Sequence, residues 1–286
     1  MRMQWFLDPF DPQFMQRALL ASMLAVVASS VVGTWVVLRR LTFLGDALAH
    51  GVIPGMALAV LWGFNLTVGA LATAALMVGG ITLVNRRARL AEDTGVGLLF
   101  VGMLALGVII ISKSRSFATD VQGLLFGDVL GITWDDIRLQ AVAAVLVLVA
   151  SAGGYRAFLA LSFNETKAAS LGLRPGLTHL ALLALIAVAI VSSFQAVGTL
   201  LVFGLLVGPP ATAALLVRHV WLCMVVAVGL GWVAVSLGLI LSYQHGTAAG
   251  ATMAGVSVAM FFAVLAGQEL AGAARRTRKV PARNVQ

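Results

Sequence analysis

Residues 39–60 read RRLTFLGDALAHGVIPGMALAV, an arginine pair followed by a long, mostly apolar run that contains Asp46 and His50. At a helical rise of about 1.5 Å per residue, counted from Arg40, Asp46 lies about 9 Å and His50 about 15 Å along this run. A bilayer hydrocarbon core is about 30 Å thick, so His50 is predicted near the membrane midplane. Ionisable side chains at that depth are costly, and they mark functional positions.

The rest of the chain is equally apolar. Of its 286 residues, 60% are hydrophobic and 10% are charged, and the mean hydropathy is +1.01. A soluble domain of this size could not cover so much apolar side chain with polar surface. The apolar runs are too long and too uniform for barrel strands, which alternate with a period of two. We therefore expect an all-α polytopic membrane protein with eight or nine transmembrane helices.

Nine apolar stretches are candidates for these helices, or eight if one short segment is re-entrant. We place them at residues 16–38, 43–63, 66–84, 95–112, 137–153, 177–194, 196–216, 221–242 and 247–266. The first stretch is preceded by Asp8 and Asp11, where a secretory signal would carry basic residues, so it is predicted to be a retained span. Residues 1–270 are expected to form a single transmembrane domain, followed by a basic cytoplasmic tail at 271–286.

Basic residues concentrate on the cytoplasmic side of short loops, which predicts the orientation of the spans. Placing Arg39 and Arg40 inside leaves 14 of the 19 lysines and arginines inside and only 5 outside. The N-terminus is thus predicted outside and the C-terminus inside. The same residues are dispersed at helix ends, without the clustering that nucleic-acid binding requires, so nucleic acid is not an expected partner.

Asp46 and His50 are four residues apart, which places both side chains on one helical face. A carboxylate oxygen and an imidazole nitrogen form half of a coordination shell for zinc, manganese or ferrous iron. Two copies of the chain facing each other would supply four ligands. The alternative is a hydrogen bond within the pair that only fixes helix packing. Gly51 and Gly55 form the small-residue repeat that permits close helix approach, and Pro54 removes a backbone donor.

The other histidines and outer acidic residues are weaker candidates. His179 and His219 fall near predicted inner helix ends, where a structural role is expected. His245, at the outer mouth, could be an entry residue for a cation, and the outer segment with Asp120 and Asp128 could attract cations or dock a partner protein, but an ordinary solvated loop is the preferred interpretation of each. The single cysteine, Cys223, excludes a disulfide framework or a cysteine metal cluster and is expected to serve packing.

The predicted inner loop at 162–176, SFNETKAASLGLRPG, suggests a short amphipathic helix that ends at a glycine and a proline. Such a helix could transmit force from a soluble partner, or it could be a plain surface connector. The residues of interest are Glu165, Ala168, Ala169, Leu171 and Gly172. No stretch of the chain matches a glycine-rich phosphate loop, so any ATP hydrolysis must come from another chain.

Four motifs together carry a family resemblance: LRRLTFLGDALAHGVIPGMALA (38–59), LLFGDVL (124–130), ETKAASLGL (165–173) and AVGTLLVFGLLVGPPATAALL (196–216). Over residues 18–266 the chain resembles the permease subunits of zinc, manganese and iron ABC importers, the ABC-3 family of the ZnuB and MntB type. The resemblance implies a homodimer, two cytoplasmic ATPase subunits and an extracytoplasmic metal-binding protein in a prokaryotic inner membrane. It also implies that Asp46 and His50 are the intramembrane metal ligands and that residues 165–172 form the coupling helix.

One segment departs from the family pattern. Before the last span, relatives commonly carry an acidic residue and a proline, whereas this chain reads YQHGTAAG at 243–250, so His245 is at most a substitute. The expected function is that of a non-enzymatic transport subunit that moves zinc, manganese or iron into the cell and has no permanent cofactor. The alternatives are a proton-coupled secondary metal transporter, with Asp46 and His50 as a proton relay, and a non-transporting membrane scaffold.

Overall fold

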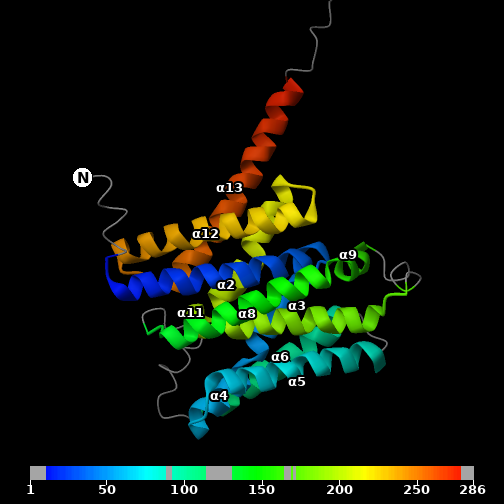
Figure 1. Cartoon of the computed structure of the whole chain (residues 1–286), viewed down its shortest axis with the longest axis vertical. Coiled ribbons are helices and arrows are strands. Elements are labelled where there is room, and N and C mark those ends of the chain that lie inside the picture. Colours follow the sequence, from blue (N-terminus) through cyan, green and yellow to red (C-terminus); the bar gives the residue numbers. More distant parts are fainter. Residues whose placement is uncertain (1–10, 88–91, 114–130, 164–168, 170–171, 278–286) are drawn as a thin grey trace, which may run out of the picture.

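The computed structural model describes residues 11–87, 92–113, 131–163, 169 and 172–277, and the regular structure within these ranges is entirely helical. The helices are α2 (Gln13–Leu38), α3 (Thr42–Gly51), α4 (Ile53–Trp62), α5 (Leu66–Arg87), α6 (Glu92–Ile111), α8 (Trp134–Gly153), α9 (Tyr155–Phe163), α11 (Pro175–Leu216), α12 (Val220–His245) and α13 (Ala249–Thr277) (Figure 1). Most run roughly alongside one another, as in a membrane bundle. The predicted all-α polytopic fold is therefore confirmed.

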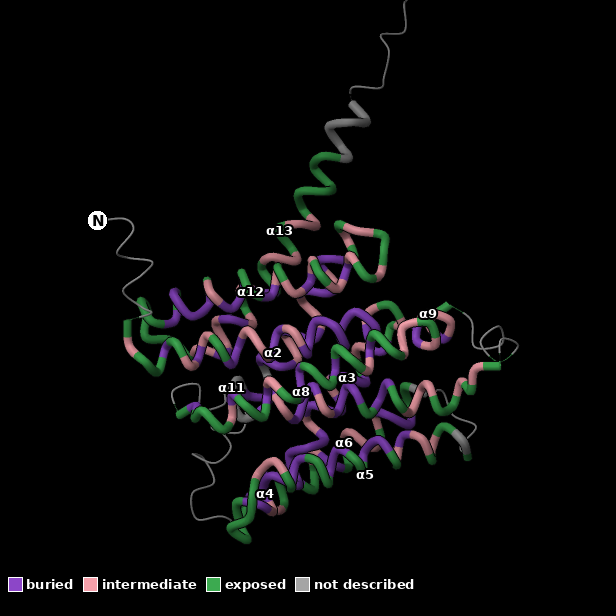
Figure 2. Tube along the Cα trace, in the orientation of Figure 1, coloured by how far each residue is buried: buried purple, intermediate pink, exposed green. Residues whose placement is uncertain are grey.

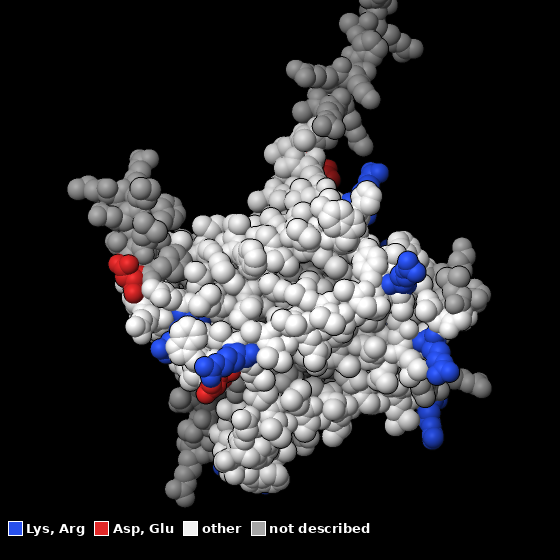
Figure 3. All heavy atoms as spheres, viewed as in Figure 1, with Lys and Arg blue, Asp and Glu red and all other residues white. Residues whose placement is uncertain are grey.

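The described residues include eight helical stretches long and apolar enough to cross a membrane. Their charged side chains gather at the ends of the bundle, and the middle of the visible face is almost free of them (Figure 3). This is the charge distribution that a hydrocarbon layer requires, because a charge at the centre of the layer is costly. The ninth predicted span, 196–216, corresponds to a shorter apolar helix, Leu201–Leu216, within α11.

Helix α2 is the centre of the bundle and packs against α8, α11 and α12. Most of its length is buried (Figure 2). The Trp35 side chain is fully buried; its Nε1–H donates to Ser151 Oγ at 2.9 Å, and its ring lies 5.4 Å from that of Tyr155. A buried indole N–H needs such a partner, since an unpaired donor costs about 1–3 kcal/mol. This hydrogen bond links α2 to α8 across 116 residues of sequence.

Glycines let the backbones of neighbouring helices touch. A Cβ atom added at Gly33 of α2 would overlap the carbonyl oxygen of Leu206 in α11, and one added at Gly238 of α12 would lie 2.5 Å from Met253 Cα in α13. Close approach of this kind is how helices associate in lipid, where no hydrophobic force pulls them together. The second half of α11 is thus held against α2 at a position where only glycine fits.

Helix α11 contains a sharp internal break. The sequence pattern placed a boundary between two spans at residue 195, whereas the hydrogen-bonded helix runs from Pro175 to Leu216 and is kinked at Gly198, with φ 73° and ψ 163°. Only glycine adopts this conformation readily. The two predicted spans are therefore two arms joined at one residue without a loop.

Helix α13 continues to Thr277, so the predicted boundary of the tail at residue 271 falls inside a helix. Its C-terminal part extends away from the bundle (Figure 1). The division into a membrane domain and a basic tail stays a prediction.

Replacing Gly198 with alanine should destabilise the protein, because the substitution forces a Cβ into a glycine-only region at a cost of about 1–3 kcal/mol. We expect Gly198→Ala to lower the apparent melting temperature of the purified protein in detergent. Gly255→Ala on α13 is the matched control, since a Cβ there meets open space. Equal melting temperatures for the two variants would contradict the kink.

Candidate intramembrane metal site

The span that carries Asp46 and His50 is broken. The pattern predicted one continuous helix over 43–63, but α3 ends at Gly51 and α4 begins at Ile53, with Val52 as the shared cap. Pro54 occupies one of the first two positions of α4, where a missing N–H is tolerated. The Thr73 hydroxyl of α5 lies 3.3 Å from the Val52 carbonyl oxygen, within hydrogen-bond reach of the interruption. Broken helices surrounded by protein at mid-membrane depth are typical of transporter binding sites.

Asp46 and His50 lie side by side at the C-terminal end of α3. The His50 Nε2 atom is 3.5 Å from Asp46 Oδ1, and the two side chains are 23% and 30% exposed, respectively. This separation is longer than the roughly 2.7–3.2 Å of a good N–H···O hydrogen bond. The second ring nitrogen, Nδ1, is buried and makes no hydrogen bond to any described residue. The pair is adjacent, as predicted, but no short hydrogen bond holds it.

Aromatic and aliphatic side chains position the pair. The rings of His50 and Phe100 (α6) form a T-shaped pair with 6.0 Å between their centroids. The rings of Phe43 and Phe100 form a second T-shaped pair, also with 6.0 Å between centroids. On another side of α3, a Cβ at Gly45 would lie 2.8 Å from a Leu206 methyl group of α11. Sequence reasoning missed Phe100 and Thr73, because each reaches α3 or its end from another helix and nothing in its local pattern marks it.

The described part of the chain contains no group of three or more histidine, cysteine, aspartate or glutamate side chains that could enclose a metal. One copy therefore offers two ligands at this position, one oxygen and one nitrogen. Zinc prefers four ligands, and harder divalent ions prefer six or more. An incomplete set suits a site that a cation must enter and leave, and it equally permits proton exchange between the two groups.

The remaining histidines make local contacts. Arg39 Nη1 lies 2.9 Å from His179 Nδ1, which joins the end of α2 to the start of α11 and supports the predicted structural role of His179. His219 is exposed and occupies the N-cap position of α12, where its side chain makes no capping hydrogen bond. His245 is also exposed, and its Nδ1 lies 3.0 Å from the Leu241 carbonyl oxygen of its own helix.

Cys223 is buried with Ala213 and Ala227 around it, which confirms its packing role. Asp120 and Asp128 lie outside the described residues, as do three of the predicted coupling residues, Glu165, Ala168 and Leu171. The flanking residues are described: Ala169 is helical and exposed, and Gly172 has a φ of 75° and donates its N–H to the Ala169 carbonyl at 3.0 Å. Gly172 thus has the conformation of a helix-ending glycine, and Pro175 opens α11.

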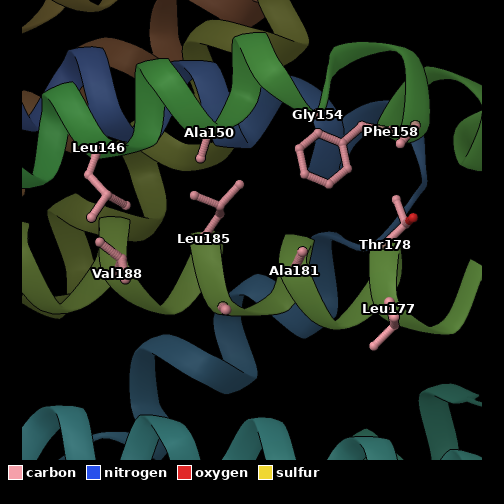
Figure 4. A pocket seen from close by; sticks show the side chains of 11 residues that line it. Leu146, Ala150, Gly154, Phe158, Leu177, Thr178, Ala181, Leu185 and Val188 are labelled. Atoms are coloured by element: carbon pink, nitrogen blue, oxygen red, sulfur yellow. The ribbon is translucent and has the colours of Figure 1, made fainter. Parts of the chain in front are cut away.

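Two apolar grooves lie elsewhere on the bundle. One, of about 490 Å³, runs between α8, α9 and α11 and is lined by small and aliphatic side chains, among them Ala150, Ala181 and Leu185 (Figure 4). The other, of about 620 Å³, lies between α2, α8 and α12. Neither is lined by Asp46 or His50, so the polar pair is not part of these grooves.

Eight apolar helices long enough to cross a membrane, with a carboxylate and an imidazole beside a broken helix, are features typical of a polytopic membrane transport protein. The sequence profile of the ABC 3 transport family matches residues 11–268, and the chain belongs to this family.

Individual relatives agree with the assignment. The chain is 36% identical over 249 residues to the manganese transport system membrane protein MntC of Listeria monocytogenes, covering 87% of this chain and 89% of the relative. It is 32% identical to a probable iron transport system membrane protein of Haemophilus influenzae, covering 92% and 96%. Among solved structures, PsaBC from Streptococcus pneumoniae in complex with Fab superposes with a TM-score of 0.82 at 28% identity, covering 92% and 95%.

The predicted close approach at the glycine repeat is confirmed next to the site. A Cβ at Gly55 would overlap the Gly69 carbonyl oxygen of α5, and a Cβ at Gly69 would overlap the Gly55 carbonyl oxygen. Gly51 faces Met77 of α5, at 3.3 Å from the position of an added Cβ. The α4 half of the broken span is therefore fixed against α5 by backbone contact.

Gly55→Ala should push α4 away from α5 and lower the melting temperature of the protein. The expected loss in the free energy of unfolding is about 1–3 kcal/mol, as for an overpacked core. The matched control is Gly79→Ala on α5, where a Cβ meets open space and alanine favours the helix by about 1 kcal/mol. Thermal unfolding of the detergent-solubilised protein measures both. A Gly55→Ala protein as stable as the control would show that the two backbones do not touch.

Proposed function

We propose that this chain is the membrane permease of an ATP-driven importer that moves a divalent transition metal, manganese, iron or zinc, into the cell. The observation that carries the proposal is the Asp46–His50 pair beside a helix break, with an imidazole nitrogen left without a partner among the described residues. The helical rise predicts a depth near the membrane midplane for this pair. In this function the pair holds the cation transiently on its way through the bilayer. The histidine coordinates in its neutral form, because a ligand nitrogen needs its lone pair.

A second copy of the chain would complete the ligand set. Two Asp46–His50 pairs facing a shared path supply four protein ligands, which satisfies zinc and leaves room for water on manganese or iron. A homodimer of this kind would meet the cation at a shared interface.

Separate subunits supply the energy and the substrate. The sequence has no phosphate-binding loop, so two cytoplasmic ATPase subunits hydrolyse the ATP, and residues 165–172 form the helix that transmits their closure. An extracytoplasmic binding protein delivers the cation to the outer face. In this proposal the chain lies in the inner membrane of a prokaryotic cell, with the N-terminus outside and the C-terminus in the cytoplasm, as the distribution of basic residues predicts.

The names of the relatives favour manganese or iron as the transported ion, since they belong to manganese and iron transport systems. The ligand types do not decide among the three metals, because one carboxylate oxygen and one imidazole nitrogen can bind each of them. The affinity of such a site for divalent metals follows the same order in most proteins, so it does not identify the transported ion.

Removing either ligand should abolish transport without unfolding the protein. We expect Asp46→Ala and His50→Ala to reduce uptake of radioactive manganese, iron and zinc to background in cells that also express the cognate ATPase and binding protein. His219→Ala, which alters an exposed histidine at a helix end, is the control and should retain uptake. The metal that wild-type cells accumulate fastest identifies the substrate.

The same assay separates the importer from a proton-coupled exchanger. Uptake that persists when the ATPase is inactivated, but is lost with Asp46→Ala, would assign the pair to proton exchange. Uptake that ignores both substitutions in an assembled complex would make the pair purely structural and refute the proposed site.

A charge on the predicted coupling helix should uncouple the subunits. Ala169 is exposed, so Ala169→Glu should leave the permease folded. The new carboxylate would stand where the ATPase docks, and an unmatched charge there should weaken binding of the ATPase. We expect metal uptake and transport-stimulated ATPase activity to fall sharply together. Gly176→Glu is the control, because this exposed residue lies in the first turn of α11, where an acidic residue is tolerated. Equal activities would remove residues 165–172 from the coupling role.

A further inference from the structure

The groove between α2, α8 and α12, here named the α8–α12 groove, has no part in the proposed transport path. Its volume is about 620 Å³, and its lining includes Val31, Ser151, Tyr155, Trp221, Val225 and Trp232. The Ser151 hydroxyl is engaged by Trp35, and the Trp232 Nε1–H donates to the Met23 carbonyl oxygen at 3.1 Å. These polar groups are paired within the protein, so the groove presents an apolar surface to any occupant.

The length of the groove corresponds to one leaflet. On α12 it extends from Trp221 to Trp232, eleven residues or about 16 Å of helix. This is about half of a hydrocarbon core that is about 30 Å thick. The residues that form its rim are open to the surroundings, with Trp221 57% and Val225 61% exposed. The groove is therefore open sideways to lipid over the depth of a single acyl chain.

Basic and aromatic residues stand at one end of the groove. Tyr155 opens α9 and is followed by the exposed Arg156. Trp221 is the second residue of α12, and the exposed Arg218 and His219 precede this helix. The starts of both helices lie at the same end of the bundle (Figure 1). Tyrosine and tryptophan prefer the membrane interface, and each basic residue near it attracts an anionic headgroup by about 1 kcal/mol. At the opposite end of the groove, the sequence around Trp232 (residues 228–236) contains no lysine, arginine or histidine.

We propose that the α8–α12 groove binds an anionic phospholipid, with one acyl chain along α12 between Trp221 and Trp232 and the headgroup phosphate near Arg156 and Arg218. A second copy of this chain is a poorer occupant, because a helix packs best against small residues, and this rim carries two tryptophans. The groove of Figure 4 has four alanines and a glycine in its lining and no tryptophan, so it offers more small residues to a packing helix. The proposal concerns a lipid site distinct from the Asp46–His50 pair.

The decisive variant is Gly229→Leu. Gly229 lines the groove, and a Cβ added there meets nothing within 4 Å, so the leucine should fill the groove without disturbing the fold. Gly102→Leu on α6 is the matched control, at another exposed glycine with open space. The charge variants are Arg156→Gln and Arg218→Gln.

The full-length permease is placed in nanodiscs that contain phosphatidylglycerol bearing a photoreactive acyl chain, and crosslinked peptides are mapped by mass spectrometry. Retention of phosphatidylglycerol relative to phosphatidylcholine is measured in parallel by native mass spectrometry. We expect crosslinks at residues 148–155 and 221–232, their loss in Gly229→Leu but not in Gly102→Leu, and a reduction of about fivefold in the preference for phosphatidylglycerol with each arginine substitution.

Crosslinks that survive Gly229→Leu, or that map elsewhere in the wild-type protein, would overturn the proposal. A Gly229→Leu protein that keeps its lipid but changes from dimer to monomer would also overturn it and would assign the groove to a second copy. Crosslinks in the groove with no loss of preference in either arginine variant would reject the anionic headgroup.

Discussion

The structure depends on one constraint of the bilayer, which offers no water to backbone groups, so every interruption of a helix must be covered by protein. The second span is interrupted at Val52, and α5, α6 and α11 surround the two halves. The Thr73 hydroxyl of α5 donates to the Val52 carbonyl oxygen at 3.3 Å, and this oxygen also accepts the Met56 N–H of α4 at 3.2 Å. Because this break is covered, α3 can end among neighbouring helices and hold Asp46 and His50 there, each still partly exposed. The candidate site exists only because neighbouring helices make the break tolerable.

Close contacts at glycines bring the neighbouring helices against the interrupted span. Gly55 and Gly69 bring α4 and α5 into backbone contact, and Gly33 brings α2 against the second arm of α11. That arm in turn carries Leu206, which packs on Gly45 one residue before Asp46. The position of Asp46 is therefore tied, through Leu206, to the kink at Gly198, which sets the direction of the second arm of α11. A site of two side chains in one turn thus relies on contacts from residues 150 or more positions away.

Much of the architecture could be predicted from the chain. Long apolar runs can only be helices in lipid, so eight of the nine predicted spans correspond to long apolar helices. The i, i+4 spacing of Asp46 and His50 placed them on one face, and the Gly51–Gly55 repeat anticipated close packing. The break at Val52 was not predicted, because a proline near a helix start and a proline inside a helix look alike in sequence. Phe100 was missed because its contact with His50 depends on how α6 lies against α3.

The sequence by itself determined the class of the protein, the rough limits of its spans, and the two side chains that could bind a cation. These follow from hydropathy and helical periodicity, which are local properties of the chain. The tertiary structure alone decided that α11 is two arms joined at Gly198, that Trp35 is linked to Ser151, and that a leaflet-long groove opens between α8 and α12. Those features arise where distant helices meet, and in lipid the meeting of helices is set by shape and close packing, which no single stretch of sequence encodes.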